Sequence, residues 1–143
     1  MLMQKKFPND PYMNREIVKS RLISELRQYG KLIIAYDFDY TVHPYKGEDW
    51  TFDYVVNLLR KWRPYAKFVV FTASPESRFP YIKNYLIKHD IPFDAINEEV
   101  ISRKYNTRKI YYNVLLDDRA GLGETVSILD EIFESISDEN ALD

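Results

Sequence analysis

Four carboxylates and one hydroxyl stand directly after apolar runs of the sequence, the places where α/β proteins commonly carry their chemistry. These residues are Asp37, Asp39, Thr72, Asp117 and Asp118. Carboxylates grouped without a counter-charge repel one another and raise each other's pKa. A positive group is therefore expected among them. Hard oxygen ligands of this kind suit Mg²⁺, which often combines one or two carboxylates with water and phosphate oxygens.

The charges of such a site indicate what it could do. Four carboxylates, one Mg²⁺ and one lysine leave a single negative charge, so one proton on a carboxyl group makes the site neutral before a substrate arrives. The site then holds an ionised carboxylate beside a protonated one. That combination predicts a nucleophile and a general acid side by side.

The elements that must position these residues alternate between strand and helix patterns. Continuous apolar runs bounded by polar residues predict strands buried on both faces, and apolar residues at helical spacing predict helices. The strands are predicted at 31–37, 67–72, 93–96 and 112–117, and the helices at 14–29, 51–62, 76–89 and 122–136. Strands and helices in this order predict an α/β fold with a small parallel, Rossmann-like sheet, arranged as a three-layer sandwich.

The length of the chain favours a single domain over residues 1–143. Residues 1–13 contain two prolines and no periodic pattern, so we expect an irregular lead-in. Residues 137–143 are short and acidic, and we expect them to fray.

Composition narrows the function classes. The sequence contains no cysteine, which excludes disulfides, thiolate metal sites and cysteine nucleophiles. The net charge is −2 and the basic residues are scattered, so sequence-specific DNA binding and membrane-surface binding are not expected. No apolar run approaches the roughly 20 residues of a spanning helix, and residues 1–12 do not resemble a secretory signal. We expect a cytoplasmic protein.

Taken together, the motifs resemble those of the haloacid dehalogenase (HAD) superfamily of phosphatases and phosphotransferases, over residues 31–136. The segment 37–42, Asp-Phe-Asp-Tyr-Thr-Val, matches the first motif of that family, Asp-x-Asp-x-Thr-(Val/Leu), after an apolar strand. The segment 68–72 matches the second motif, an apolar strand ending in Thr or Ser. The paired aspartates at 117–118 match the fourth motif.

The third motif of the family is a single lysine. Lys109, which precedes Asp117 by eight residues, is the best match, and Lys104 and Lys83 are alternatives. Lys83 falls on the charged face of a predicted helix, a face that is normally solvated. Tyr40 departs from the pattern of the family, which often has a small residue at this position. We expect its ring to affect substrate specificity.

The resemblance implies a Mg²⁺-dependent phosphatase that acts on phosphate monoesters. Asp37 would attack phosphorus and form an aspartyl-phosphate. Asp39 would protonate the leaving oxygen and then act as a base on the attacking water. Thr72 and Lys109 would bind the phosphoryl oxygens.

The same resemblance implies the ligands of the metal ion. They are an oxygen of Asp37, the backbone carbonyl of Asp39, and the carboxylates of Asp117 and Asp118, either of which could be the direct ligand.

Cap domains usually set specificity in this family, and the segments 43–71 and 75–108 leave no room for one. An open site suits a large phosphorylated substrate, such as a polynucleotide end or a phosphoprotein. It also suits a nucleotide or sugar phosphate enclosed by a partner subunit of a homo-oligomer. Tyr40, Tyr45 and Trp50 are candidates for substrate contact.

The alternative function is that of a non-catalytic metal- or phosphate-binding domain with the same fold. The presence of both Asp37 and Asp39 favours an enzyme. A signalling receiver domain is excluded, because its acidic pair and its phosphorylated aspartate lie on different strands. His43 follows the first motif and either contacts substrate or has no functional role.

Overall fold

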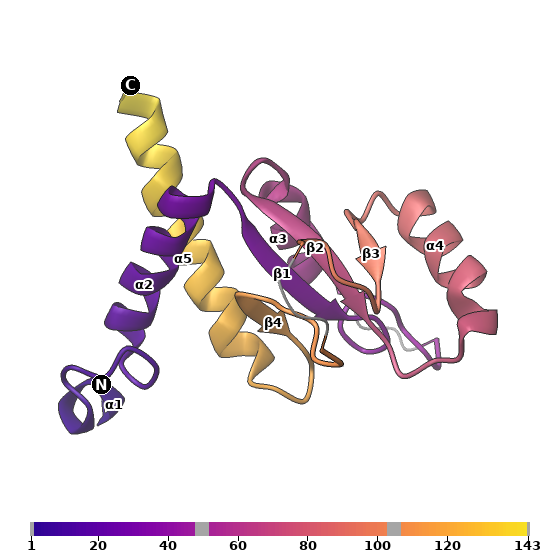
Figure 1. Cartoon of the computed structure of the whole chain (residues 1–143), viewed down its shortest axis with the longest axis horizontal. Helices are drawn as coiled ribbons and strands as arrows, with labels where there is room; N and C mark the ends of the chain where they lie inside the picture. The colour runs from indigo at the N-terminus through magenta and orange to yellow at the C-terminus, as the bar shows by residue number, and fades with distance from the viewer. Residues whose placement is uncertain (1, 48–51, 103–106, 143) are drawn as a thin grey trace.

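The computed structural model describes residues 2–47, 52–102 and 107–142, and within these ranges the chain forms an all-parallel sheet with helices packed against it (Figure 1). The strands are β1 (Leu32–Asp37), β2 (Ala66–Phe71), β3 (Ala95–Ile96) and β4 (Val114–Leu116). Their spatial order is β3-β2-β1-β4. The predicted α/β fold with a small parallel sheet is confirmed, and each strand begins and ends within two residues of its predicted bounds.

The helices after the first form where apolar residues recur at helical spacing. They are α1 (Leu2–Lys6), α2 (Arg15–Tyr29), α3 (Asp53–Lys61), α4 (Phe79–Lys88) and α5 (Leu122–Leu142), with 3₁₀ turns at Arg63–Tyr65 and Glu76–Arg78. Asn14 caps α2, because its side chain accepts hydrogen bonds from the backbone N–H groups of Glu16 and Ile17. Gly30 ends that helix with a φ of 81°, a conformation that suits glycine.

Both ends of the chain contain more helix than the sequence predicts. The lead-in contains α1. The last turn of this helix carries Lys5 and Lys6, and positive charges at the carboxyl end of a helix are stabilising. The acidic tail continues α5 to Leu142 instead of fraying. This stretch contacts α2, where Arg27 donates to both carboxylate oxygens of Glu139 at 2.8 Å.

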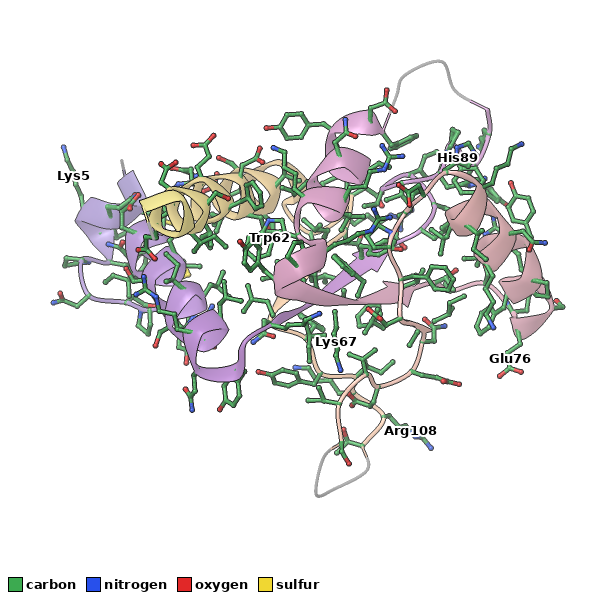
Figure 2. All side chains as sticks on the ribbon, turned by 90° about the horizontal axis from the view of Figure 1, so that it is seen from above. Lys5, Trp62, Lys67, Glu76, His89 and Arg108 are labelled. Carbon is green, nitrogen blue, oxygen red and sulfur yellow. The ribbon has the colours of Figure 1, made fainter. Side chains whose placement is uncertain are left out.

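The two faces of the sheet are covered differently. Side chains of β1 and β2 on one face, including Ile34 and Phe68, pack in a core with residues of α2, α3, α4 and α5. On the other face, Ile33 and Val69 pack against residues of the chain between β3 and β4, namely Val100, Ile101, Ile110 and Tyr112. Figure 2 shows Arg108 on that stretch, on the side of the sheet away from α3 and α5.

The order of the strands explains this arrangement. The chain steps from β1 to β2 to β3 in one direction, so right-handed crossovers place α3 and α4 on the same face. It then returns across the sheet to β4, which places the last connection on the opposite face. The described part of that connection contains no helix, so the layer it forms is irregular chain.

Two connections leave the carboxyl ends of the central strands, β1 and β2. Residues 38–52 join β1 to α3, and residues 72–75 join β2 to the 3₁₀ turn before α4. Within the described residues these connections contain no cap domain, so the end of the sheet is left open. Nor does any helix in the described part of the chain combine the length and apolar character needed to cross a bilayer.

Candidate active site

Strand pairing brings the predicted site residues to one edge of the sheet. Asp37, the last residue of β1, pairs with Phe71, and Tyr36 pairs with Leu116. Thr72, which follows β2, and Asp117, which follows β4, therefore lie on the two sides of Asp37. These three residues line both of two adjoining cavities, of about 560 and 570 Å³.

Three of the four predicted carboxylates form a compact acidic group. One oxygen from each of Asp37, Asp117 and Asp118 lies within 4.8 Å of the others. The pKa of Asp37 is raised to about 7, first by burial, then by its hydrogen bond with Asp118 and by the charges of Asp117, Asp118 and Asp39. Burial and the neighbouring carboxylates therefore favour the protonated form of Asp37 more than water would.

Thr41, the threonine of the first motif, links the two strands that carry this group. Its hydroxyl oxygen accepts a hydrogen bond from the backbone N–H of Asp118 at 3.1 Å. The same hydroxyl lies 3.3 Å from Oδ1 of Asp118 and 3.5 Å from Oδ2 of Asp37, and its single proton can be donated to one of them. Thr41 is fully buried, so it fixes the spacing of these aspartates and does not contact substrate.

Asp39 has a different environment from its neighbours in the motif. Arg78 donates to Oδ2 at 2.5 Å and to Oδ1 at 3.0 Å, and Nδ1 of His43 lies 2.8 Å from Oδ1. Burial by itself would raise the pKa of Asp39, but the hydrogen bonds and charges of Arg78 and His43 outweigh burial and lower it. Asp39 is ionised at neutral pH.

This result changes the expected distribution of protons. The sequence indicates one protonated carboxyl, and the resemblance implies that Asp39 is the acid. In the structure the raised pKa belongs to Asp37 and the lowered pKa to Asp39. The physical reason is Arg78, a counter-charge that the sequence analysis did not place beside the motif. The available signal was its position, six residues after Thr72 at the start of a predicted helix.

His43 holds Asp39 and does not face the cavities. It is 6% exposed, its ring stacks on Phe38 with a centroid distance of 4.6 Å, and its Nε2 lies 2.8 Å from the hydroxyl of Tyr81. Both ring nitrogens are therefore used within the protein. The sequence suggested that His43 either contacts substrate or has no functional role. Neither prediction describes this residue, which positions the carboxylate of Asp39.

Thr72 is held in place by a residue that the sequence analysis missed. The backbone N–H of Thr72 donates to Oδ1 of Asn97 at 3.0 Å, and Nδ2 of Asn97 donates to the Thr72 carbonyl at 2.8 Å. Asn97 follows β3 with a φ of 53°, a conformation that asparagine adopts more readily than most residues. The Thr72 hydroxyl accepts from the backbone N–H of Ser74 at 3.0 Å and donates to no acceptor in the described part of the chain.

Of the three candidate lysines, Lys109 lines a cavity together with Asp37 and Thr72. Lys83 is exposed on α4 and lines neither cavity. Lys104 lies outside the described residues, as does Trp50.

The two tyrosines of the loop after β1 line the cavity on the Asp39 side. Tyr40 and Tyr45 are in edge-to-face contact, with ring centroids 6.1 Å apart. Tyr40 has a φ of 64°, which is uncommon for a residue with a side chain and is easily adopted by glycine. This backbone conformation is a physical reason for a small residue at that position.

Comparison with known proteins shows the fold and not the activity. No family model matches the chain, and no curated protein matches it. Among solved structures, the chain is similar to a conserved protein from Bacteroides thetaiotaomicron, with a TM-score of 0.56 and 18% identity over 76% of this chain and 92% of that chain. At this identity the likeness supports the α/β fold alone.

Proposed function

We propose that this protein is a divalent-cation-dependent phosphomonoester hydrolase that forms an aspartyl-phosphate on Asp37. The observation that carries the proposal is a half-buried carboxyl group that shares two cavities with Thr72 and lies against two carboxylates that form no ion pair within the described residues. A carboxylate so placed can act as a nucleophile once a positive charge offsets its neighbours.

The donor set fits a hard divalent cation such as Mg²⁺. Asp37, Asp117 and Asp118 would hold it through carboxylate oxygens within 4.8 Å of one another, with the backbone carbonyl of Asp39 as the further proposed ligand. When bound, the cation supplies charge that lets an anionic nucleophile approach an anionic phosphoryl group. Burial and the neighbouring carboxylates raise the pKa of Asp37, and a cation held by this group would favour the ionised form of its carboxyl.

In the first step, an oxygen of Asp37 forms a bond to phosphorus and the bond from phosphorus to the leaving oxygen breaks. The hydroxyl of Thr72 and the ammonium group of Lys109 would bind phosphoryl oxygens, since both residues line the cavity that contains Asp37. The leaving oxygen takes up a proton through Asp39. Because the pKa of Asp39 is lowered, this carboxylate must first receive that proton from the monoanionic substrate.

In the second step, Asp39 acts as a general base, the role for which its ionised state suits it directly. It takes a proton from a water molecule, the water oxygen attacks phosphorus, and the phosphoryl bond to Asp37 breaks. Arg78 and His43 hold both oxygens of Asp39 in place during this transfer.

The test is a phosphate-release assay with a generic aryl phosphate, with Mg²⁺ and with excess chelator. We expect turnover with Mg²⁺ only, and its loss in Asp37→Asn. Asp138→Asn is the matched control, because Asp138 is an exposed aspartate on α5 outside both cavities. Full activity in chelator would contradict the proposal. Mg²⁺-dependent phosphate binding without turnover would support the alternative, a non-catalytic binding domain.

A further inference from the structure

Arg78 uses only part of its hydrogen-bonding capacity inside the protein. An arginine side chain carries five N–H donors in a fixed plane. Nη1 donates to Oδ2 of Asp39 and to Oγ of Ser74, at 2.5 and 2.7 Å, and Nη2 donates to Oδ1 of Asp39 at 3.0 Å. Three of the five donors are thus used, and in the described part of the chain the other two have no acceptor.

The two remaining donors lie on the same edge of the guanidinium group. Asp39 occupies the fork between Nη1 and Nη2, and Ser74 takes the outer hydrogen of Nη1. What remains is the Nε–H and the outer hydrogen of Nη2, which are parallel to each other in the planar group. Two parallel N–H donors are the arrangement that binds a carboxylate or phosphate through two oxygens.

The guanidinium group is rigidly placed beside the proposed reaction centre. Its central carbon lies 5.3 to 5.6 Å from the ring centroids of Phe38, Tyr45 and Tyr81. The side chain is 22% exposed and lines the 570 Å³ cavity whose wall also contains Asp37 and Asp39. A donor pair on a side chain that is held in place at a cavity wall can bind an anion with little further loss of conformational entropy.

We propose that Arg78 binds a second anionic group of the substrate through its Nε–Nη2 edge, while its other edge continues to hold Asp39. The preferred substrates are then phosphomonoesters whose leaving group carries another oxyanion, either a carboxylate or a further phosphate. This inference rests on the proposed function and makes Arg78 a specificity-determining residue for it. Tyr40 and Tyr45, which line the same cavity, provide an aromatic wall for the part of the leaving group between its two anionic groups.

The test compares pairs of substrates that differ mainly in one charge. The 3- and 4-carboxyphenyl phosphates are measured against the corresponding carbamoylphenyl phosphates, whose amide is uncharged and similar in shape. Phenylene bisphosphates form a third arm, which separates a preference for phosphate from one for carboxylate. For the wild type we expect the ratio of kcat/KM values, anionic over neutral, to be roughly 10 to 100, the range of a charge-assisted hydrogen-bonded pair.

Three variants separate the proposed contact from other effects. In Arg78→Gln the ratio is expected to fall close to 1, and in Arg78→Lys, which keeps the charge but not the paired donors, to fall severalfold. Arg119→Gln removes the same charge from the wall of the same cavity at an exposed position, and its ratio is expected to stay within about threefold of the wild type.

Two outcomes would overturn the inference. If Arg78 only holds Asp39, Arg78→Gln will slow both members of each pair equally and the ratio will not change. If Arg119→Gln lowers the ratio as much as Arg78→Gln does, the preference arises from the net charge of the cavity and not from the donor edge of Arg78.

A binding measurement keeps this inference separate from the proposed function. Calorimetry with Asp37→Asn, which cannot turn substrate over, compares the affinities for the carboxyphenyl and carbamoylphenyl phosphates with and without Arg78→Gln. Hydrolysis of both substrates at equal rates would reject the role of Arg78 and leave the phosphatase proposal standing. Failure of the wild type to hydrolyse any substrate, with Arg78-dependent preference in binding, would reject the phosphatase proposal and leave the anion site standing.

Discussion

Asp37 and Asp39 are two positions apart in the chain, yet their carboxyl groups have opposite electrostatic partners. Asp37 faces Asp117 and Asp118, which raise its pKa together with burial, whereas Asp39 is bound by Arg78. The nucleophile and the proton-transfer group of the proposed mechanism need different ionisation behaviour, and the separate partners of Asp37 and Asp39 are suited to provide it.

The first prediction concerns stability against pH in the presence of chelator. The pKa of Asp37 is about 7 in the folded protein and 3.8 when unperturbed, so between these values the folded state holds a proton that the unfolded state does not. Stability is then expected to fall as pH rises from about 4 to about 7. Asp39 has the opposite shift, and its contribution is lost only below its ordinary value of 3.8.

Thermal unfolding of the wild type and of Asp37→Asn across this pH range tests the point. The variant has no ionisable group at position 37, so its unfolding temperature is expected to fall less as pH rises. Asp138→Asn, on the exposed surface of α5, is expected to keep the wild-type slope. Identical slopes in the wild type and in Asp37→Asn would show that Asp37 has an ordinary pKa.

The second prediction is that Mg²⁺ stabilises the folded protein. A ligand that binds only the folded state adds about 2.7 kcal/mol at a concentration of 100 times its Kd, and here it also relieves repulsion among Asp37, Asp117 and Asp118. The unfolding temperature at pH 7 is expected to rise with Mg²⁺ in the wild type and much less in Asp117→Asn. No shift in the wild type at millimolar Mg²⁺ would argue against the site.

The third prediction separates the roles of the two aspartates of the first motif. Asp37→Asn removes the nucleophile, so turnover is expected to fall by several orders of magnitude with no phosphoenzyme. Asp39→Asn keeps the nucleophile and loses the base, an effect of roughly 10² to 10⁴. With 4-nitrophenyl phosphate, whose leaving group needs no proton, Asp39→Asn is expected to accumulate aspartyl-phosphate. Acid quenching followed by intact-mass measurement detects it, and label on a residue other than Asp37 would contradict the assignment.

The fourth prediction concerns the positioning of Thr72 by Asn97. Asn97→Gly removes both side-chain hydrogen bonds to the Thr72 backbone, while glycine accepts the φ of 53° without strain. We expect kcat/KM to fall roughly tenfold, because small displacements of a group that binds the phosphoryl oxygens are costly. Thr72→Val, which removes the hydroxyl itself, serves as the reference. If Asn97→Gly retains wild-type kinetics while Thr72→Val does not, Thr72 is positioned without Asn97.

Much of the fold was predictable because its strands are buried on both faces. Such strands carry uninterrupted apolar runs, which is why β1 and β2 were predicted within one residue at each end. The end of α5 was not predictable in the same way. Residues 137–142 lack a strong apolar pattern, and their contact with α2, between Arg27 and Glu139, joins positions 112 residues apart in the chain.

The sequence by itself determined that Asp37, Thr72 and Asp117 meet, because each stands at the carboxyl end of a strand and parallel strands end at the same edge of a sheet. Only the tertiary structure decided that Asp39, and not Asp37, has a counter-charge. The contact between Asp39 and Arg78 spans 39 positions of the chain, and the contact between Thr72 and Asn97 spans 25. Contacts of this kind depend on where loops and helix starts fold back onto the sheet, and hydrophobic periodicity carries no information about that.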